Sequence, residues 1–105
     1  MKVTSLSDFV DFTDERFGRS AVLSSNQAAL FLYCFKPGQE MPDHTHPFSA
    51  EYLLVLEGEA VISMDVESVL AGVHQAVLIP PEAVHAISNA GSAPLVIASF
   101  MSPRP

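Results

Sequence analysis

The sequence is poor in the residues that several classes of function require. Its 105 residues include one cysteine, Cys34, so no disulfide can form within the chain. A free thiol favours a reducing compartment. Five lysines and arginines stand against twelve acids, for a net charge of −7. The basic residues are scattered, whereas phosphate backbones and anionic membrane surfaces bind clustered positive charge. We therefore expect no nucleic-acid partner and no membrane partner.

Long apolar runs are absent as well. The chain has no stretch of about 18 uninterrupted apolar residues, so we expect no membrane-spanning helix. Its first ten residues hold no apolar run of the length that a signal peptide requires. We therefore expect a cytoplasmic protein.

Apolar residues, in contrast, are plentiful. They make up 49% of the chain, while charged residues make up 16%, against a usual share of about 25%. The length fits a single domain over residues 1–105, with a core at about residues 21–101 and a lead-in segment at residues 1–20. So much apolar surface with so little charge predicts that a second subunit covers part of it, as in a homodimer.

Short β-branched and aromatic runs recur between turn residues, which is typical of an all-β sandwich or barrel. The segment Ser7–Phe17 fits neither a period of 2 nor one of 3.6, so a short helix capped by Ser7 and an irregular lead-in both remain open. Several strands are apolar on both faces, which requires a second sheet or a second subunit on the outside. The strands that we expect lie near Ala21–Ser24, Leu30–Phe35, Glu51–Leu56, Ala60–Met64, His74–Ile79, Val84–Ser88 and Leu95–Met101.

Two histidines and a glutamate form the first candidate site. Residues two apart in a strand point to the same face, so His44 and His46 are expected to present their imidazoles side by side. Pro47 biases His46 toward an extended backbone. Glu51 follows five residues after His46, which leaves enough chain to bend and return a carboxylate to the same point. By itself, such a histidine pair is more often a polar surface pair than a metal site.

A third histidine follows a proline turn later in the chain. His85 stands among Val84, Ala86 and Ile87, where a lone histidine is more usually a buried, hydrogen-bonded core residue. Three of the four histidines of the chain nevertheless belong to this segment and the preceding one. The residues alone leave a metal site and a core histidine as alternatives.

Both segments resemble the two conserved motifs of the cupins. The second motif departs from the pattern at two positions, because His74 and Glu82 stand where cupins have glycines. The resemblance covers about Leu30 to Met101. The matching residues are Gly38, His44, His46, Glu51 and Gly58 in the first motif, and Pro80, His85 and Asn89 in the second.

The resemblance implies an antiparallel jelly-roll β-barrel with one divalent metal ion at the mouth of its cavity. It also implies four ligands, His44, His46, Glu51 and His85. Three imidazoles and a carboxylate without sulfur suit Fe, Mn, Ni, Co or Zn. The histidines must be neutral to bind, so we expect the metal to be lost below about pH 6.

Four protein ligands on a six-coordinate ion leave two positions for water, a bidentate substrate, or a substrate and O₂. This favours a metal-dependent enzyme, dioxygenase-like or isomerase-like, that acts on a small molecule. A non-catalytic module that binds or senses a small molecule, and a structural barrel that serves a partner protein, are the alternatives.

No general base is evident among the remaining residues. His74 is expected at the surface end of a strand, and Cys34 as an inert core thiol. Tyr33, Met41 and Phe48 are candidates for the cavity wall, and all three could equally pack elsewhere.

Overall fold

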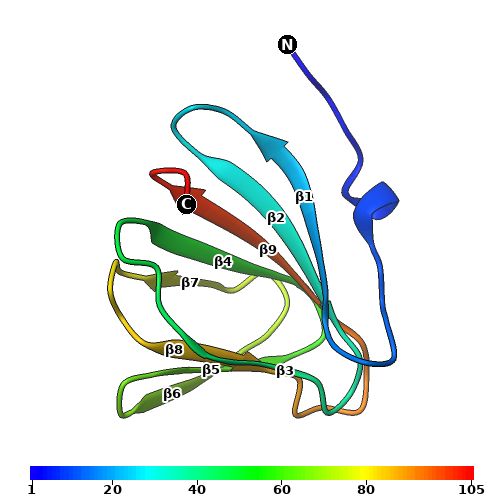
Figure 1. Cartoon of the computed structure of the whole chain (residues 1–105). Coiled ribbons are helices and arrows are strands. Elements are labelled where there is room, and N and C mark those ends of the chain that lie inside the picture. Colours follow the sequence, from blue (N-terminus) through cyan, green and yellow to red (C-terminus); the bar gives the residue numbers. More distant parts are fainter.

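Nine strands in two antiparallel sheets build the protein, as Figure 1 shows. The computed structural model describes residues 1–105. One sheet has five strands in the order β1-β2-β9-β4-β7, and the other has four in the order β3-β8-β5-β6. The strand bounds are β1 Gly18–Ser24, β2 Ala29–Phe35, β3 Glu40–His44, β4 Ala50–Glu57, β5 Ala60–Met64, β6 Glu67–Ala71, β7 Ala76–Ile79, β8 His85–Ser88 and β9 Leu95–Ser102.

The core lies between the two facing sheets. Side chains alternate along each strand, so every second residue of β2, β4 and β9 enters the interior. Phe35, Val55, Leu95 and Ile97 are fully buried there, and Ile87 of β8 closes the core from the opposite sheet. The all-β antiparallel barrel that the sequence predicts is confirmed. No helix of the structure is long and apolar enough to cross a membrane.

Each of the seven expected strands occurs, and two further strands were not expected. The strand β6 escapes the sequence pattern because Glu67, Ser68, Val69 and Leu70 are all exposed, which removes the alternation of apolar and polar residues. It pairs only with β5, at the edge of its sheet. The strand β3 contains Pro42 and has a register shift along its length, as edge strands tolerate.

The N-terminal segment is mostly irregular and includes one 3-10 turn, η1 (Leu6–Phe9). A helix capped by Ser7 is wrong, since Ser7 lies inside this turn and Ser5 precedes it without a capping hydrogen bond. The expected lead-in of 20 residues is slightly too long, because β1 already begins at Gly18.

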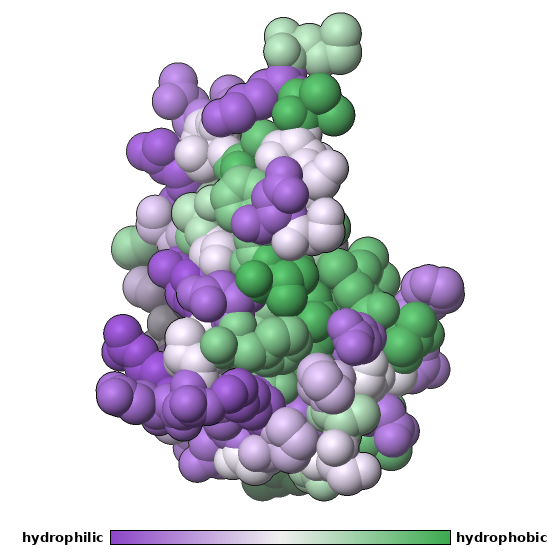
Figure 2. Space-filling view, turned by 90° about the vertical axis from the view of Figure 1, so that its right-hand side faces the viewer, coloured by the Kyte–Doolittle hydropathy of each residue, from purple (hydrophilic) through white to green (hydrophobic).

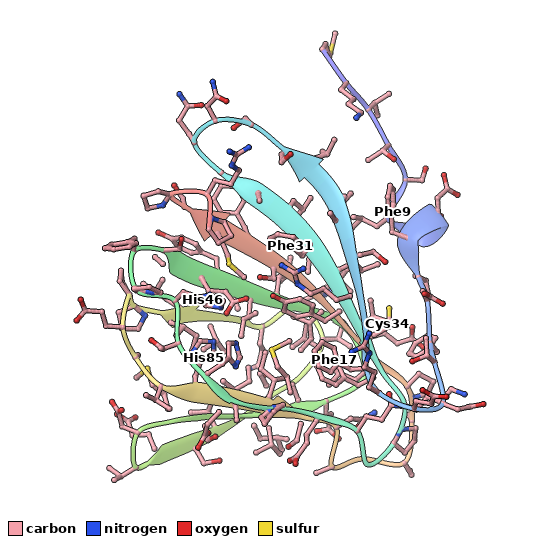
Figure 3. The ribbon with its side chains drawn as sticks, in the orientation of Figure 1. Phe9, Phe17, Phe31, Cys34, His46 and His85 are labelled. Atoms are coloured by element: carbon pink, nitrogen blue, oxygen red, sulfur yellow. The ribbon has the colours of Figure 1, made fainter.

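This segment crosses the outer face of the five-stranded sheet. Its apolar side chains, including Phe9, pack against Val22, Leu32 and Cys34. Figure 2 looks onto the face that the segment crosses, where apolar side chains gather near the middle. Figure 3 shows Phe9 on the side of the sheet away from His46 and His85. The chain itself therefore covers part of the outer apolar face for which the sequence required a partner.

Cys34 is a buried residue under this cover, with 1% of its surface exposed. Burial raises the pKa of its thiol. A buried thiol with a raised pKa has little thiolate character, which agrees with the expectation of an unreactive core residue.

Two turns adopt the left-handed backbone that normally favours glycine. His74 and Glu82, which replace the motif glycines, have φ angles of 70° and 71°. His74 therefore lies in a turn before β7, and its expected place in that strand is wrong. The backbone N–H of Glu82 donates a hydrogen bond of 2.9 Å to the carbonyl of His46. Through this hydrogen bond, the strained turn fixes the loop that carries His46, a candidate ligand.

Relief of this strain provides a test. We expect Glu82→Gly to raise the free energy of unfolding by about 0.5–1 kcal/mol, because glycine adopts a positive φ without the steric cost of a Cβ. Denaturant unfolding measures the change. The control Glu82→Ala removes the exposed carboxylate and keeps the Cβ, so it should bring no such gain; an equal gain in both variants would contradict the explanation.

Candidate metal centre

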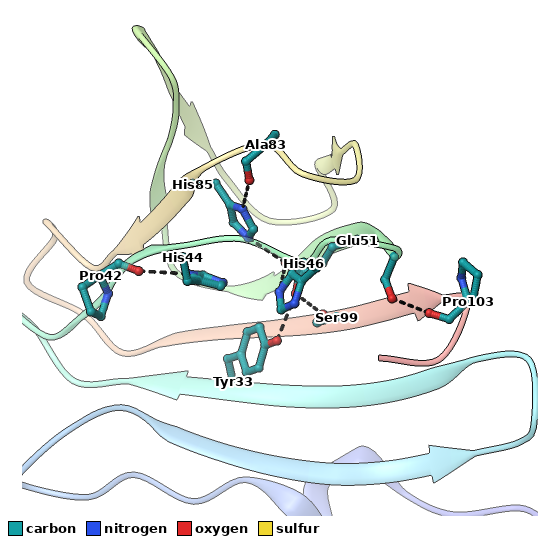
Figure 4. A network of polar contacts seen from close by, with 10 residues as sticks. Tyr33, Pro42, His44, His46, Glu51, Ala83, His85, Ser99 and Pro103 are labelled. Carbon is teal, nitrogen blue, oxygen red and sulfur yellow. Dashed lines mark hydrogen bonds and ion pairs between the residues drawn. The ribbon is translucent and has the colours of Figure 1, made fainter.

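Four residues from three strands and one loop converge inside one end of the barrel, as Figure 4 shows. His44 ends β3 and is the Cα partner of His85 at the start of β8, so strand pairing brings their rings to a centroid distance of 4.1 Å. The ring of His46 lies 5.1 Å from that of His44 and 5.5 Å from that of His85. Glu51 reaches the cluster from β4 in the opposite sheet.

The ligand atoms of these four residues all lie within 4.8 Å of one another. His44, His46, Glu51 and His85 are therefore positioned to bind a metal ion, as the sequence predicted. The reason given for the histidine pair needs correction, because His46 lies beyond the end of β3. The chain bends after β3, and this bend, rather than the alternation of one strand, turns the ring of His46 toward the cluster. The planes of the His44 and His46 rings are 81° apart.

The nitrogen atoms of the imidazoles are oriented as metal ligands require. Nδ1 of His44 lies 2.9 Å from the carbonyl of Pro42, and Nδ1 of His85 lies 2.9 Å from the carbonyl of Ala83. Each Nδ1 must carry a proton to donate to a carbonyl, which leaves Nε2 with a lone pair when the ring is neutral. Backbone carbonyls therefore select the tautomer that presents Nε2 to a cation.

His46 supplies a further observation that fits a metal. Its Nε2 is a buried side-chain polar atom without a hydrogen-bond partner, and it lies 3.6 Å from Oε1 of Glu51. A buried polar atom left unpaired costs about 1–3 kcal/mol. A divalent ion among the four residues would satisfy this nitrogen.

Glu51 is fully buried, and its two oxygens have separate surroundings. Oε2 accepts hydrogen bonds from the hydroxyl of Tyr33 at 2.9 Å and from that of Ser99 at 2.5 Å. Oε1 faces the imidazoles and lies 3.0 Å from Nε2 of His85. The two hydroxyls thus occupy one oxygen and leave the other directed at the candidate metal position.

The electrostatic surroundings keep the carboxylate charged and one imidazole neutral. Burial raises the pKa of Glu51, but hydrogen bonds from His85, Ser99 and Tyr33 outweigh it and leave the pKa below its usual value. Burial lowers the pKa of His46 and prevails over the attraction of Glu51. Burial and the charge of Glu51 raise the pKa of Tyr33, so its phenol remains a donor. A charged carboxylate beside a neutral imidazole suits a cation.

The pKa of His85 is shifted in the opposite direction to that of His46. Burial lowers the pKa of His85, but its hydrogen bond to Glu51 and its contact with Ala83 reverse the effect, and the pKa lies above the usual value. A proton on Nε2 then joins His85 to Oε1 of Glu51. A metal ion that binds here must displace this proton, so acid opposes binding.

The structure also places the remaining candidates. Ser99 was missed, although it is a polar residue at an inward position of an otherwise apolar strand, which is a signal in the sequence. Tyr33, a candidate for the cavity wall or an interface, donates a hydrogen bond to Glu51. Met41 belongs to the core, whereas Phe48 is 81% exposed and is not a core residue. His74 is exposed and outside the cluster.

The two hydroxyls allow a test of how Glu51 is held. We expect Tyr33→Phe and Ser99→Ala each to weaken the affinity for a divalent ion by about 10–100-fold, the usual effect of removing a partner that orients a ligand. Competition with a coloured chelator measures the affinity. Tyr52→Phe, at an exposed tyrosine of the outer face, should have no effect. Unchanged affinity in the double variant Tyr33→Phe/Ser99→Ala would contradict the assignment.

Comparison with known proteins agrees with this geometry. The Cupin domain family (Cupin_2) matches residues 31–101. The Tetracenomycin polyketide synthase protein TcmJ of Streptomyces glaucescens is 33% identical over 72 residues, which are 66% of this chain and 48% of TcmJ. This chain spans about half the length of the curated relatives that it matches most significantly.

Solved structures share the whole fold. The crystal structure of TT1209 from Thermus thermophilus superimposes with a TM-score of 0.94 at 28% identity and covers 100% of both chains. That of an RmlC-like cupin protein from Desulfovibrio desulfuricans has a TM-score of 0.89 at 26% identity and covers 100% of this chain and 99% of the other. With its two motifs, its barrel and its family match, the chain belongs to the cupin family.

Proposed function

We propose that this protein is a mononuclear metalloenzyme that acts on a small molecule. A divalent ion is held by Nε2 of His44, His46 and His85 and by Oε1 of Glu51. The observation that carries the proposal is the buried, unpaired Nε2 of His46 among three other donor atoms, all within 4.8 Å. When bound, the ion supplies Lewis-acid activation or, if it is Fe or Mn, a place for O₂, which corresponds to isomerase-like or dioxygenase-like chemistry.

An enzyme is supported over a structural barrel by the nature of the donors. Structural zinc sites are usually closed and often use cysteine, whereas this cluster contains none. Histidine and carboxylate donors suit ions that take six ligands, which leaves positions for a substrate. The name of TcmJ places that relative in polyketide synthesis, so small-molecule chemistry is our inference for this chain as well.

The protein's own groups determine how such a site works. Tyr33 and Ser99 hold Oε2 of Glu51, so the carboxylate offers Oε1 alone to the ion. The backbone carbonyls at Pro42 and Ala83 fix the rings of their histidines. The apolar core beneath the cluster, with Leu53 and Ile87 almost fully buried, excludes water from that side.

Metal content tests the proposal. We expect about one equivalent of a divalent metal in untagged protein purified without chelator, and loss of most of it in His46→Ala. The control is His74→Ala, which removes the one histidine outside the cluster and should keep the full amount. Elemental analysis measures all three. A metal-free protein after reconstitution, or equal loss in both variants, would contradict the site.

The same assay has an expected pH dependence. Protons compete with the ion for the imidazoles, so affinity rises with pH through the histidine pKa values, and metal is lost below about pH 6. Because the pKa of His85 is raised, we expect the loss of metal to begin at a higher pH than it would with an imidazole of ordinary pKa. A full metal content at pH 4.5 would be inconsistent with imidazole ligands.

A non-catalytic module that binds or senses a small molecule through the metal is the second candidate. It is supported by the lack of an assigned general base near the cluster, since His74 lies outside it. Consumption of O₂ by Fe- or Mn-loaded protein with candidate substrates would favour the enzyme. Tight binding without turnover would favour the module.

We also propose that the protein is a homodimer with a cytoplasmic location. The free thiol of Cys34 is consistent with a reducing compartment. Part of the outer sheet face is left bare by the N-terminal segment. It exposes large apolar side chains, with Tyr52 and Phe100 at a ring distance of 6.0 Å and Leu54 and Leu78 on the neighbouring strands β4 and β7. A second copy of the chain would bury this apolar face.

The mass in solution tests the dimer. We expect twice the chain mass of 11.3 kDa by light scattering, and a shift toward the monomer in Leu54→Glu, which places a charge on the apolar face. Val66→Glu introduces the same charge at a fully exposed position outside this face and should remain dimeric. A monomeric wild-type protein would contradict the proposal.

A further inference from the structure

Two arginines line one hollow of the surface, although the chain is acidic. The hollow has a volume of about 340 Å³ and is lined by Arg16, Phe17 and Arg19. These are two of only five basic residues in a chain with a net charge of −7. Neither arginine forms an ion pair: Lys36 pairs with Asp14, and the other ion pairs are those of Glu51 with histidines. Both guanidinium groups are therefore free to bind an anion.

The hollow adjoins the interior face that carries the metal cluster. Arg19 of β1 is the Cα partner of Tyr33 in β2, so their side chains share one face of the sheet. The guanidinium of Arg19 lies 4.1 Å from the ring centroid of Phe31, another residue of that face. Tyr33 in turn donates its hydroxyl to Glu51. Tyr33 therefore lies between Arg19 and Glu51, which is a candidate metal ligand.

Aromatic rings pack between the arginines and the cluster. The ring of Phe17 packs edge-on against Tyr33 at 6.2 Å and is stacked on Phe35 at 5.1 Å. Figure 3 shows Phe17 and Phe31 on the inner side of the sheet, the side of His46 and His85. Phe17 is the one ring of this group that lines the hollow, and the others are buried in the core.

Stacking on Phe31 holds one face of the Arg19 guanidinium and leaves its N–H edges available. A planar guanidinium with free edges binds carboxylate and phosphate groups through paired hydrogen bonds.

We propose that Arg16 and Arg19 bind the anionic group of a small organic molecule, a carboxylate or a phosphate, whose apolar body lies on Phe17. The ligand class is therefore a compact organic anion with an apolar ring. Phe31 and Tyr33 are buried beneath the hollow, so the anion site is separate from the candidate metal centre and does not rest on the proposed function.

Binding of simple probes tests this site. Benzoate and phenyl phosphate carry the two anionic groups on an apolar ring, and benzamide is the neutral counterpart of benzoate. Titration calorimetry of metal-loaded protein gives affinities, and the ring resonances of Phe17 and Phe31 locate the probes by NMR. We expect at least one anion to bind about tenfold or more tightly than benzamide, the usual effect of a charge-assisted pair, and to shift both rings. The anion that binds more tightly identifies the group.

Variants separate this site from nonspecific attraction. Arg19→Gln removes the charge and the guanidinium and leaves a shorter polar side chain, so we expect a loss of about tenfold or more in anion affinity with an unchanged metal content. Arg104→Gln removes the same charge at an exposed arginine outside the hollow and should retain the wild-type affinity. The proposal is overturned if neither benzoate nor phenyl phosphate binds more tightly than benzamide. It is also overturned if Arg19→Gln and Arg104→Gln lose anion affinity equally.

The two proposals fail in different ways. If the wild-type protein holds no metal, the proposed function fails, and anion binding is then measured on the metal-free protein with the same variants. If metal is bound but Arg19→Gln leaves anion affinity unchanged, the anion site is wrong and the metal centre stands.

Discussion

The structure depends on one buried carboxylate. Glu51 has no exposed surface, and an uncompensated charge in such a place costs several kcal/mol. Its partners come from three different strands: Tyr33 from β2, Ser99 from β9 and His85 from β8. The first two belong to the same sheet as Glu51 and the third to the opposite sheet. The requirement to stabilise this charge therefore joins the two sheets at a polar cluster within the core.

The positions of the three imidazoles depend on backbone geometry. His44 and His85 meet because the edge strand β3 pairs with β8 beyond a shift of register that precedes His44. His46 lies outside the strands. The N–H of Glu82, in a left-handed turn, donates a hydrogen bond to the carbonyl of His46. That conformation costs a residue with a Cβ about 1–2 kcal/mol. Hydrogen bonds from the N–H groups of Glu82 and Ala83 to the carbonyls of His46 and Pro80 hold the turn, and the strained turn in this way supports the candidate site.

Much of the fold could be predicted from alternation of apolar residues. The seven strands with a buried face were expected, whereas β6 was not, because Glu67–Ala71 exposes all but its last residue and forms only through pairing with β5. The N-terminal segment was left undecided for a related reason. Phe9 packs on a sheet face built from β1, β2 and β9, so no local period describes it. Its place is set by a surface that exists only after the sheet has formed.

The four candidate ligands were predicted through the resemblance to the cupin motifs, because the residues alone left a metal site and a core histidine as alternatives. Their arrangement was not evident. The two hydroxyls on Glu51 and the pairing of Arg19 with Tyr33 join residues that are distant in the chain. Local sequence therefore specified which side chains and which strands the protein uses. Long-range strand register decided which of them meet, because a contact across a sheet depends on pairing that no short segment encodes.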